Sequence, residues 1–186
     1  MGHCSRLLQN YQRFVQLPWP KYLAGKQRVW FAIYPPSEER RVRAHVQEFQ
    51  VGTIDAGRKW QLVDISDLPA KWLAAHPDRE AYFAEPSALQ AIEEEVRAHT
   101  IKALCDVLFS QEADEDTVVS VLGVGALFGF AHLSPIISRI EDSIRGRLLV
   151  FFPGEYERNL YRFMDARDGF NYMAVPITSN ESVLIP

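Results

Sequence analysis

The chain has 186 residues, a mass of 21.3 kDa, a formal net charge of −4 and a pI near 5.7. Its hydrophobic fraction of 47% and aromatic fraction of 12% are typical of a globular protein with a real core, and the acidic balance argues against a polyanion-binding protein. Two cysteines are too few for a disulfide framework, which favours a cytoplasmic location. We expect no signal peptide, and no apolar run is long enough to cross a bilayer.

The predicted elements begin with an amphipathic helix over residues 5–18, because apolar residues recur at helical spacing until Pro18. Four apolar runs of strand-forming residues follow: 28–34, 60–66, 118–122 and 147–152. Helical patterns lie between these runs: 37–57, a long helix opening at 86, and 133–145. The long helix is expected to bury Leu89, Ile92, Val96, Ala103 and Val107. Residues 161–165 and 172–177 are candidates for further strands.

Uniformly apolar strands that alternate with helices predict βαβ units and a mainly parallel sheet. The expected fold class is therefore α/β. It is a three-layer domain with a mainly parallel sheet of about five strands flanked by helices, plus the N-terminal amphipathic helix. We expect a single domain over residues 1–178 and a loose tail over residues 179–186.

Acidic residues follow the predicted strands at the edge where such sheets bind ligands. Those that could converge there are Asp64, Asp67, Glu155 and Glu157. Oxygen-rich clusters suit Mg²⁺ or Mn²⁺, but acidic residues are also common where strands meet water. A metal site and a solvated edge are thus two interpretations, and the second is favoured.

The glycine-rich segment GVGALFG, residues 123–129, lies between a strand and a helix, where a phosphate loop belongs. It lacks the Gly-Lys-Ser/Thr of the P-loop, and Gly129 falls one residue late for the dinucleotide pattern. We interpret Leu127, Phe128 and Phe130 as core residues around glycines that allow close backbone packing. The alternative is a degenerate phosphate loop in a nucleotide- or metal-binding regulatory protein or enzyme.

The remaining reactive side chains form no catalytic pattern. Glu95 and His99 share a helix face without a third metal ligand, so a surface pair is expected. Cys105 lies among apolar helix residues, where burial makes a thiol inert. The arginines of residues 40–43 should fan around a helix as a solvated face rather than form a nucleic-acid footprint. We therefore expect a non-enzymatic protein with no catalytic residue, no cofactor and no metal.

Residues 153–172 combine aromatic and charged side chains at unusual density. This composition is typical of recognition surfaces, where aromatic anchors supply binding energy. It also occurs in folded loops, where tyrosine hydroxyls and arginines bind backbone carbonyls, and both interpretations stay open. The candidate partner-binding residues are Trp19, Glu155, Tyr156, Glu157, Tyr161 and Arg162.

Several strings in the chain resemble the BrxB family of bacteriophage-exclusion (BREX) defence systems. They are RVWFAIY, ERRVRAHVQEF, WQLVDISD and, most specifically, GRLLVFFPGEYE followed by YR and DARDGFNYMAVPI. The resemblance covers about residues 5 to 178.

The resemblance implies membership of a cytoplasmic, multi-gene anti-phage complex rather than a known activity. It implies a connector whose most plausible direct partner is the phosphatase-superfamily protein PglZ. The ATPase BrxC and the methyltransferase PglX are further candidates, with no direct contact with nucleic acid and no membrane. It supplies no catalytic residues. Five more residues are then interpreted as fold-specifying or partner-facing: Gly154, Asp165, Arg167, Asp168 and Tyr172.

Overall fold

The computed structural model describes residues 2–164 and 171–180. The α-helices are α1 (His3–Val15), α2 (Glu39–Ala44), α3 (Val46–Asp55), α4 (Leu68–Ala75), α5 (Arg79–Ala84), α6 (Glu93–Leu108) and α7 (Leu133–Ile140). The strands are β1 (Val29–Tyr34), β2 (Lys59–Asp64), β3 (Thr117–Leu122), β4 (Arg147–Glu157), β5 (Leu160–Phe163) and β6 (Val175–Ile177). Short 3-10 helices are η1 (Gly25–Arg28), η2 (Pro36–Glu38), η3 (Pro86–Ile92), η4 (Val124–Leu127) and η5 (Glu141–Ser143).

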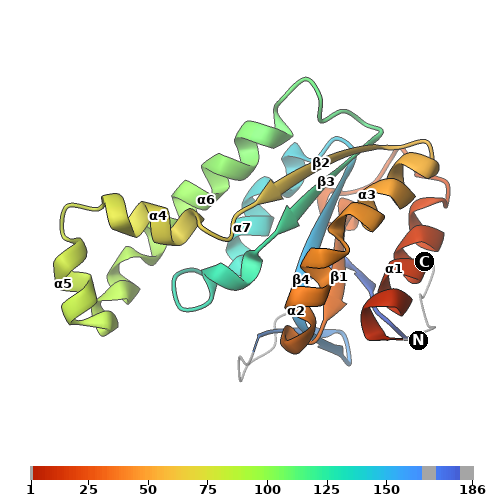
Figure 1. The fold of residues 1–186 in the computed structure, drawn as a ribbon. Coiled ribbons are helices and arrows are strands. Elements are labelled where there is room, and N and C mark those ends of the chain that lie inside the picture. The colour runs from red at the N-terminus through yellow and green to blue at the C-terminus, as the bar shows by residue number, and fades with distance from the viewer. Residues whose placement is uncertain (1, 165–170, 181–186) are drawn as a thin grey trace.

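The strands form a mainly parallel sheet in the order β2-β3-β4-β1-β6 (Figure 1). All neighbours along this path pair in parallel, and β5 pairs antiparallel with the distal part of β4. The expected α/β class and its mainly parallel sheet are confirmed.

Both faces of the sheet are covered, which explains why the central strands are uniformly apolar. On one face α1 and α3 pack over Trp30 and Phe151, and the ring of Phe151 meets that of Phe49 edge-on at 5.1 Å. On the other face α6 and α7 pack over Phe31 and Phe152, whose rings stack at 5.0 Å. Successive residues of each strand therefore enter different cores, as the two-residue strand period requires.

The N-terminal helix packs on its own domain. Tyr11 of α1 hydrogen-bonds to Thr53 of α3 at 2.6 Å, and both residues are buried. Asn10 donates to the carbonyls of Thr178 and Asn180 at 2.8 and 3.1 Å. Ser179 is buried and hydrogen-bonds to the ring of His3. Residues 179 and 180 of the expected loose tail are thus packed on α1, and residues 181–186 lie outside the described residues.

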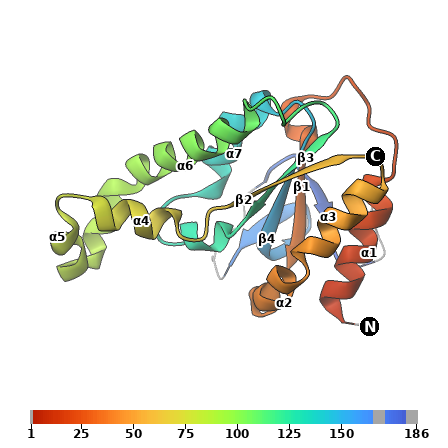
Figure 2. The same cartoon turned by 45° about the horizontal axis from the view of Figure 1, so that its top comes forward.

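Three helical predictions needed correction. The helix over 37–57 is interrupted at His45, which is not helical and ends α2 where α3 begins. No helix was predicted between the strand at 60–66 and residue 86, but this segment forms α4 and α5, which project from the sheet together with the first half of α6 (Figure 2). Helix α6 starts only at Glu93, after a 3-10 turn; Ile92 and Val96 are buried as expected, whereas Ala103 and Val107 are half-buried beside the stripe of Val96, Thr100, Leu104 and Leu108.

Candidate functional site

The carboxyl ends of the parallel strands meet at one edge of the sheet, as predicted, and two adjoining cavities lie there. The smaller, about 270 Å³, is lined by residues that follow β1 and β3 and by Pro153 of β4. The larger, about 530 Å³, has six polar lining residues: Arg43, Asp64, Ser66, Asp67, Lys71 and His99. Arg43 lines both cavities, so the two form one candidate site around its guanidinium.

Arg43 of α2 joins the segment after β1 to the turn after β2. Its Nε donates to Glu39 Oε1 at 2.7 Å, and its terminal nitrogens donate to Asp64 Oδ2 at 3.3 Å and Ser66 Oγ at 2.6 Å. Tyr34, at the end of β1, donates its hydroxyl to the other oxygen of Glu39 at 2.6 Å. Five side chains from three segments, namely the end of β1, α2 and the end of β2 with its following turn, are therefore held in one hydrogen-bonded network.

The charges of this network largely satisfy one another. Partial burial raises the pKa of Asp64, but hydrogen bonds from Ser66 and the charge of Arg43 outweigh it, so the pKa lies below its ordinary value. Burial, followed by the hydrogen bond to Glu39, raises the pKa of Tyr34 and keeps it a hydrogen-bond donor. Chemically the site can present His99 and the exposed Lys71, which lies 3.4 Å from Asp67, to a ligand, whereas Arg43 is engaged by three side chains.

The glycine turn after β3 serves packing. Gly123 has φ +85°, and a Cβ on it would lie 2.7 Å from the backbone nitrogen of Ser66. Val124 and Leu127 of the following 3-10 turn are buried, so the close-packing interpretation holds at Gly123. A Cβ on Gly125 would meet its nearest atom only at 3.6 Å, and one on Gly129 would meet none within 4 Å. Phe128 was expected in the core but is 48% exposed, because the chain leaves the 3-10 turn there and α7 begins only at Leu133.

The four acidic residues expected at this edge do not converge. Asp64 and Asp67 line the larger cavity, whereas Glu155 and Glu157 lie on β4 where it continues beyond the sheet and pairs with β5. Over residues 2–164 and 171–180, no group of three or more His, Cys, Asp or Glu side chains is arranged to hold a metal ion. Glu95 lies 3.9 Å from the His76 ring nitrogen, across the gap to α4.

The segment with the candidate partner residues is a β-hairpin. Glu155 pairs with Arg162 and Tyr156 with Tyr161 across β4 and β5. The two-residue turn, Arg158 and Asn159, has φ values of 51° and 65°. Two positive φ values in the turn match the right-handed twist of the flanking strands.

One face of this hairpin packs on the domain and the other is exposed. Tyr161 was predicted to face a partner, but it is 1% exposed, donates its hydroxyl to the carbonyl of Ala174 at 2.7 Å and packs edge-on against Phe31. Tyr161 is therefore a core residue, and Tyr156 beside it is half-buried. The exposed face carries Glu155, Glu157, Leu160 and Arg162; we call this set the hairpin face.

Two other expectations concern the same part of the chain. Tyr172 is buried and donates its hydroxyl to Glu141, and Gly154 is packed so closely that a Cβ would lie 3.1 Å from the carbonyl carbon of Arg162. Both residues are fold-specifying. Asp165, Arg167 and Asp168 lie outside the described residues.

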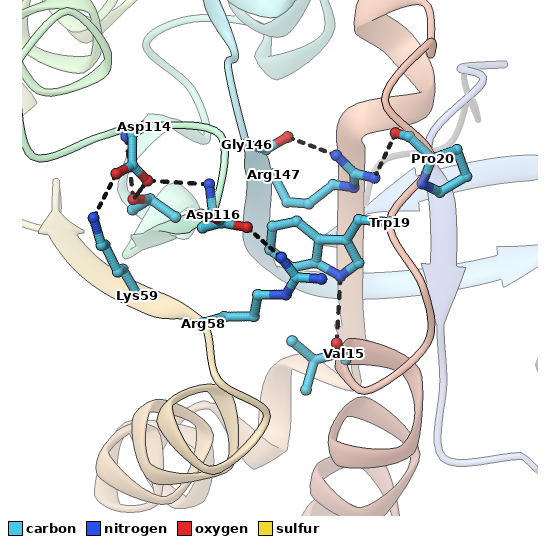
Figure 3. A network of polar contacts seen from close by, with 10 residues as sticks. Val15, Trp19, Pro20, Arg58, Lys59, Asp114, Asp116, Gly146 and Arg147 are labelled. Carbon is cyan, nitrogen blue, oxygen red and sulfur yellow. Dashed lines mark hydrogen bonds and ion pairs between the residues drawn. The ribbon is translucent and has the colours of Figure 1, made fainter.

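Trp19, the sixth candidate, lies at the opposite edge of the sheet from the cavities, near the start of β4 (Figure 3). Its half-buried indole is covered by the guanidinium groups of Arg58 and Arg147, 4.2 and 4.7 Å from the ring centroid. Burial, followed by the charges of Arg28 and Arg58, lowers the pKa of Arg147 to about 10, so it stays charged at neutral pH. Trp19 thus contributes to a structural cluster.

Both thiols lie in unreactive surroundings, as was expected for Cys105. Cys4 is buried and Cys105 is half-buried against the core, and burial is the main cause that raises the pKa of both. A raised pKa leaves less thiolate at neutral pH and lowers reactivity.

Four further residues belong to the candidate sites but were not predicted from the sequence: Glu39, Arg43, Ser66 and Leu160. Glu39 and Arg43 are four residues apart on a helix, a spacing that signals an ion pair. Their contact with Ser66 has no local signal, because the two segments are brought together only by the sheet. Leu160 could have been found from the alternation that places it across from Glu157.

Within the described ranges, the helices are too short or too polar to span a bilayer. Comparison with protein-family models, with curated proteins and with solved structures found no match to this chain.

Proposed function

We propose that this chain is a non-catalytic adaptor of a cytoplasmic BREX-type anti-phage complex that docks a PglZ-type component. The proposal starts from the resemblance of its sequence to the BrxB family. An ATPase of the BrxC type and a methyltransferase of the PglX type are further candidate partners. The proposal includes neither direct binding to nucleic acid nor attachment to a membrane.

The hairpin face is the observation that carries this proposal. β4 continues beyond the sheet, so one side of the hairpin is anchored by Tyr161 and Phe163 while the other is left to solvent. That exposed side combines an apolar residue, Leu160 at 46% exposure, with the charged pair of Glu155 and Arg162, 3.4 Å apart. A rigid, mixed polar and apolar face is suited to specific docking.

A charge swap tests the hairpin face without changing net charge. The variant Glu155→Arg with Arg162→Glu keeps the cross-strand ion pair but reverses its orientation. The matched control is Lys102→Glu with Asp106→Lys on α6, an exposed pair at 2.8 Å. Size-exclusion chromatography with light scattering of each chain, mixed with the PglZ-type protein of its operon, measures complex formation.

We expect the unchanged chain and the α6 swap to co-elute with the PglZ-type protein, and the hairpin swap to elute separately. Reversed charges at an interface cost several kcal/mol, enough to abolish micromolar binding. Co-elution of the hairpin swap would remove the hairpin face from the proposal. Failure of the unchanged chain to associate with any companion protein would refute the adaptor function itself.

A second candidate function is favoured by the smaller cavity. It adjoins Gly123 and Gly125, so a nucleotide-binding regulatory protein with a degenerate phosphate loop at 123–129 is the alternative. A ligand at a hundredfold excess over Kd stabilises the folded state by about 2.7 kcal/mol. A thermal shift with millimolar nucleotide and Mg²⁺ or Mn²⁺ would support this alternative, and an unchanged Tm would count against it.

A further inference from the structure

Strand β2 forms an open edge of the sheet. Among the described residues it pairs only with β3, and its six residues are exposed or half-buried throughout. The other edge, β6, is three residues long and contains Pro176, which has no N–H to donate. A long edge strand without proline is the one that can accept another strand.

The backbone polarity of β2 follows from its pairing with β3. The N–H of Lys59 donates to Asp116 and the N–H of Ile65 donates to Leu122, both at 2.9 Å. Residues 59, 61, 63 and 65 therefore direct their N–H and C=O groups toward β3. The backbone groups of Trp60, Leu62 and Asp64 point away from the sheet, because successive residues of a strand alternate in this direction.

The outer edge also has an apolar component. Leu62 is 45% exposed, and it lies on the same face of the sheet as Trp60, which packs beside the core under α3. Exposed apolar residues on an unpaired edge indicate a surface that gains stability when it is covered.

We propose that β2 pairs antiparallel with β2 of a second copy of this chain, joining the two sheets across a twofold axis at Gln61. A twofold axis perpendicular to the sheet requires that opposed residues share a face, so the register must be centred on one residue. Centring on Gln61 places Trp60 opposite Leu62 of the second copy, twice. Cross-strand pairs of an aromatic and an aliphatic residue stabilise a sheet.

The charges along β2 favour this register, and they favour a second copy of the chain as the strand that pairs with β2. With the axis at Gln61, Arg58 lies opposite Asp64 of the second copy at each end of the interface. The Arg58 guanidinium, which also stacks on Trp19 and pairs with Asp116, there brings a positive charge toward the Asp64 carboxylate. Centring on Leu62 would instead place Trp60 opposite Asp64. The side chain of Asp64 is 47% exposed despite its contact with Arg43, so it remains accessible. The strand is therefore complementary to itself, as an isologous interface requires.

Cross-linking tests the register. Gln61→Cys would meet its own counterpart at a non-hydrogen-bonded pair with a Cα–Cα distance of about 4.5 Å, suited to a disulfide. The control, Val63→Cys, is on the same face and equally half-buried. It would lie about 13 Å from its counterpart, too far for a disulfide. The unchanged chain, which contains Cys4 and Cys105, is oxidised in parallel.

Light scattering over protein concentrations of about 1 to 500 µM measures the molecular mass and so tests whether the chain dimerises through β2. The substitution Leu62→Pro removes one outward-facing N–H and leaves the hydrogen bonds to β3 in place. Leu62→Lys is the second variant, used if circular dichroism shows that the proline variant is unfolded. It places a charge on an exposed side chain in the middle of the interface.

We expect the unchanged chain to reach twice the chain mass of 21.3 kDa and the Leu62 variants to stay at the single mass. Oxidised Gln61→Cys should run as a covalent dimer, and Val63→Cys as a monomer. A chain that is monomeric at every concentration and does not cross-link would overturn the proposal. So would a dimer that survives both Leu62 variants, or equal cross-linking at both cysteine positions.

Discussion

Replacing Trp19 with alanine should destabilise the domain, because its indole is the centre of a stacked cluster. The ring lies between the guanidinium groups of Arg58 and Arg147 and meets Trp30 edge-on at 5.6 Å. Its N–H donates to the carbonyl of Val15 at 3.3 Å, at the end of α1. The substitution therefore removes contacts that join α1 to the starts of β1 and β4 (Figure 3).

The magnitude follows from burial and charge. Truncating a fully buried tryptophan to alanine costs about 3–5 kcal/mol, and half-burial reduces this to about 2 kcal/mol. A cation–π contact adds about 0.5–1 kcal/mol at an exposed site and about 2 kcal/mol when desolvated. Arg147 is buried and Arg58 is half-buried, and the terms overlap. We expect the free energy of unfolding to fall by about 3 kcal/mol.

Urea unfolding followed by far-ultraviolet circular dichroism measures this loss independently of tryptophan fluorescence. The matched control is Trp72→Ala, since Trp72 is also half-buried but its ring packs beside that of His76 rather than at the centre of the cluster. It should lose less stability than Trp19→Ala. A double-mutant cycle with Arg58→Ala should give a coupling free energy of about 0.5–1 kcal/mol.

A loss below about 1 kcal/mol for Trp19→Ala, with no coupling to Arg58, would refute this reasoning. Trp19 would then be a surface residue and a candidate for partner binding. A loss of the expected size means that weaker complex formation by this variant would report impaired folding rather than a lost contact.

Three further predictions concern single sites. Gly123→Ala should lower the free energy of unfolding by about 2–4 kcal/mol, because the left-handed backbone conformation is strained for alanine and the new Cβ clashes with the turn after β2. The control Gly57→Ala, with φ +73° and open space around it, should lower it by only about 1–2 kcal/mol, and equal losses in thermal unfolding would show that the clash is relieved. Tyr161→Phe should lower the free energy of unfolding in urea by about 1 kcal/mol, because the buried carbonyl of Ala174 loses its hydrogen-bond donor. An unchanged free energy would mean that water replaces the hydroxyl. Hydrogen bonds from Lys59 and Thr117 lower the pKa of Asp114 to about 2, below its unfolded value of about 4. Its stabilising contribution should therefore be complete above about pH 5 and be lost as the pH falls toward 2, so the stability difference from Asp114→Asn should shrink over that range; a constant difference would contradict the shift.

The sequence was sufficient to predict the α/β class, because each strand of the central sheet is recognisable from a few neighbouring residues. β1 and residues 148–152 of β4 are apolar throughout, which signals strands covered on both faces. The glycine at 123 could likewise be assigned to close packing once no lysine was found to complete a phosphate loop. These properties are local, since they depend on propensity and on burial pattern within one segment.

The composition of the site could be predicted only in part. Alternation along the hairpin shows that Tyr161 and Arg162 point to opposite sides, but it does not show which side is covered by the domain. The Arg43 contacts with Asp64 and Ser66 join residues more than 20 positions apart in the chain. Sequence reasoning had no spacing from which to infer them.

The position of each strand in the sheet was decided by the tertiary structure alone. β2 contains Lys59, Gln61 and Asp64 and is more polar than the central strands, but this alone does not place it. It lies at the edge because the connection from β1 crosses β4 and β3 before the chain returns. Edge position determines which backbone groups are left unpaired, and with them the surface available to a second chain. Local propensity can specify that a strand forms, but strand order depends on how the helices between the strands pack on the two faces of the sheet.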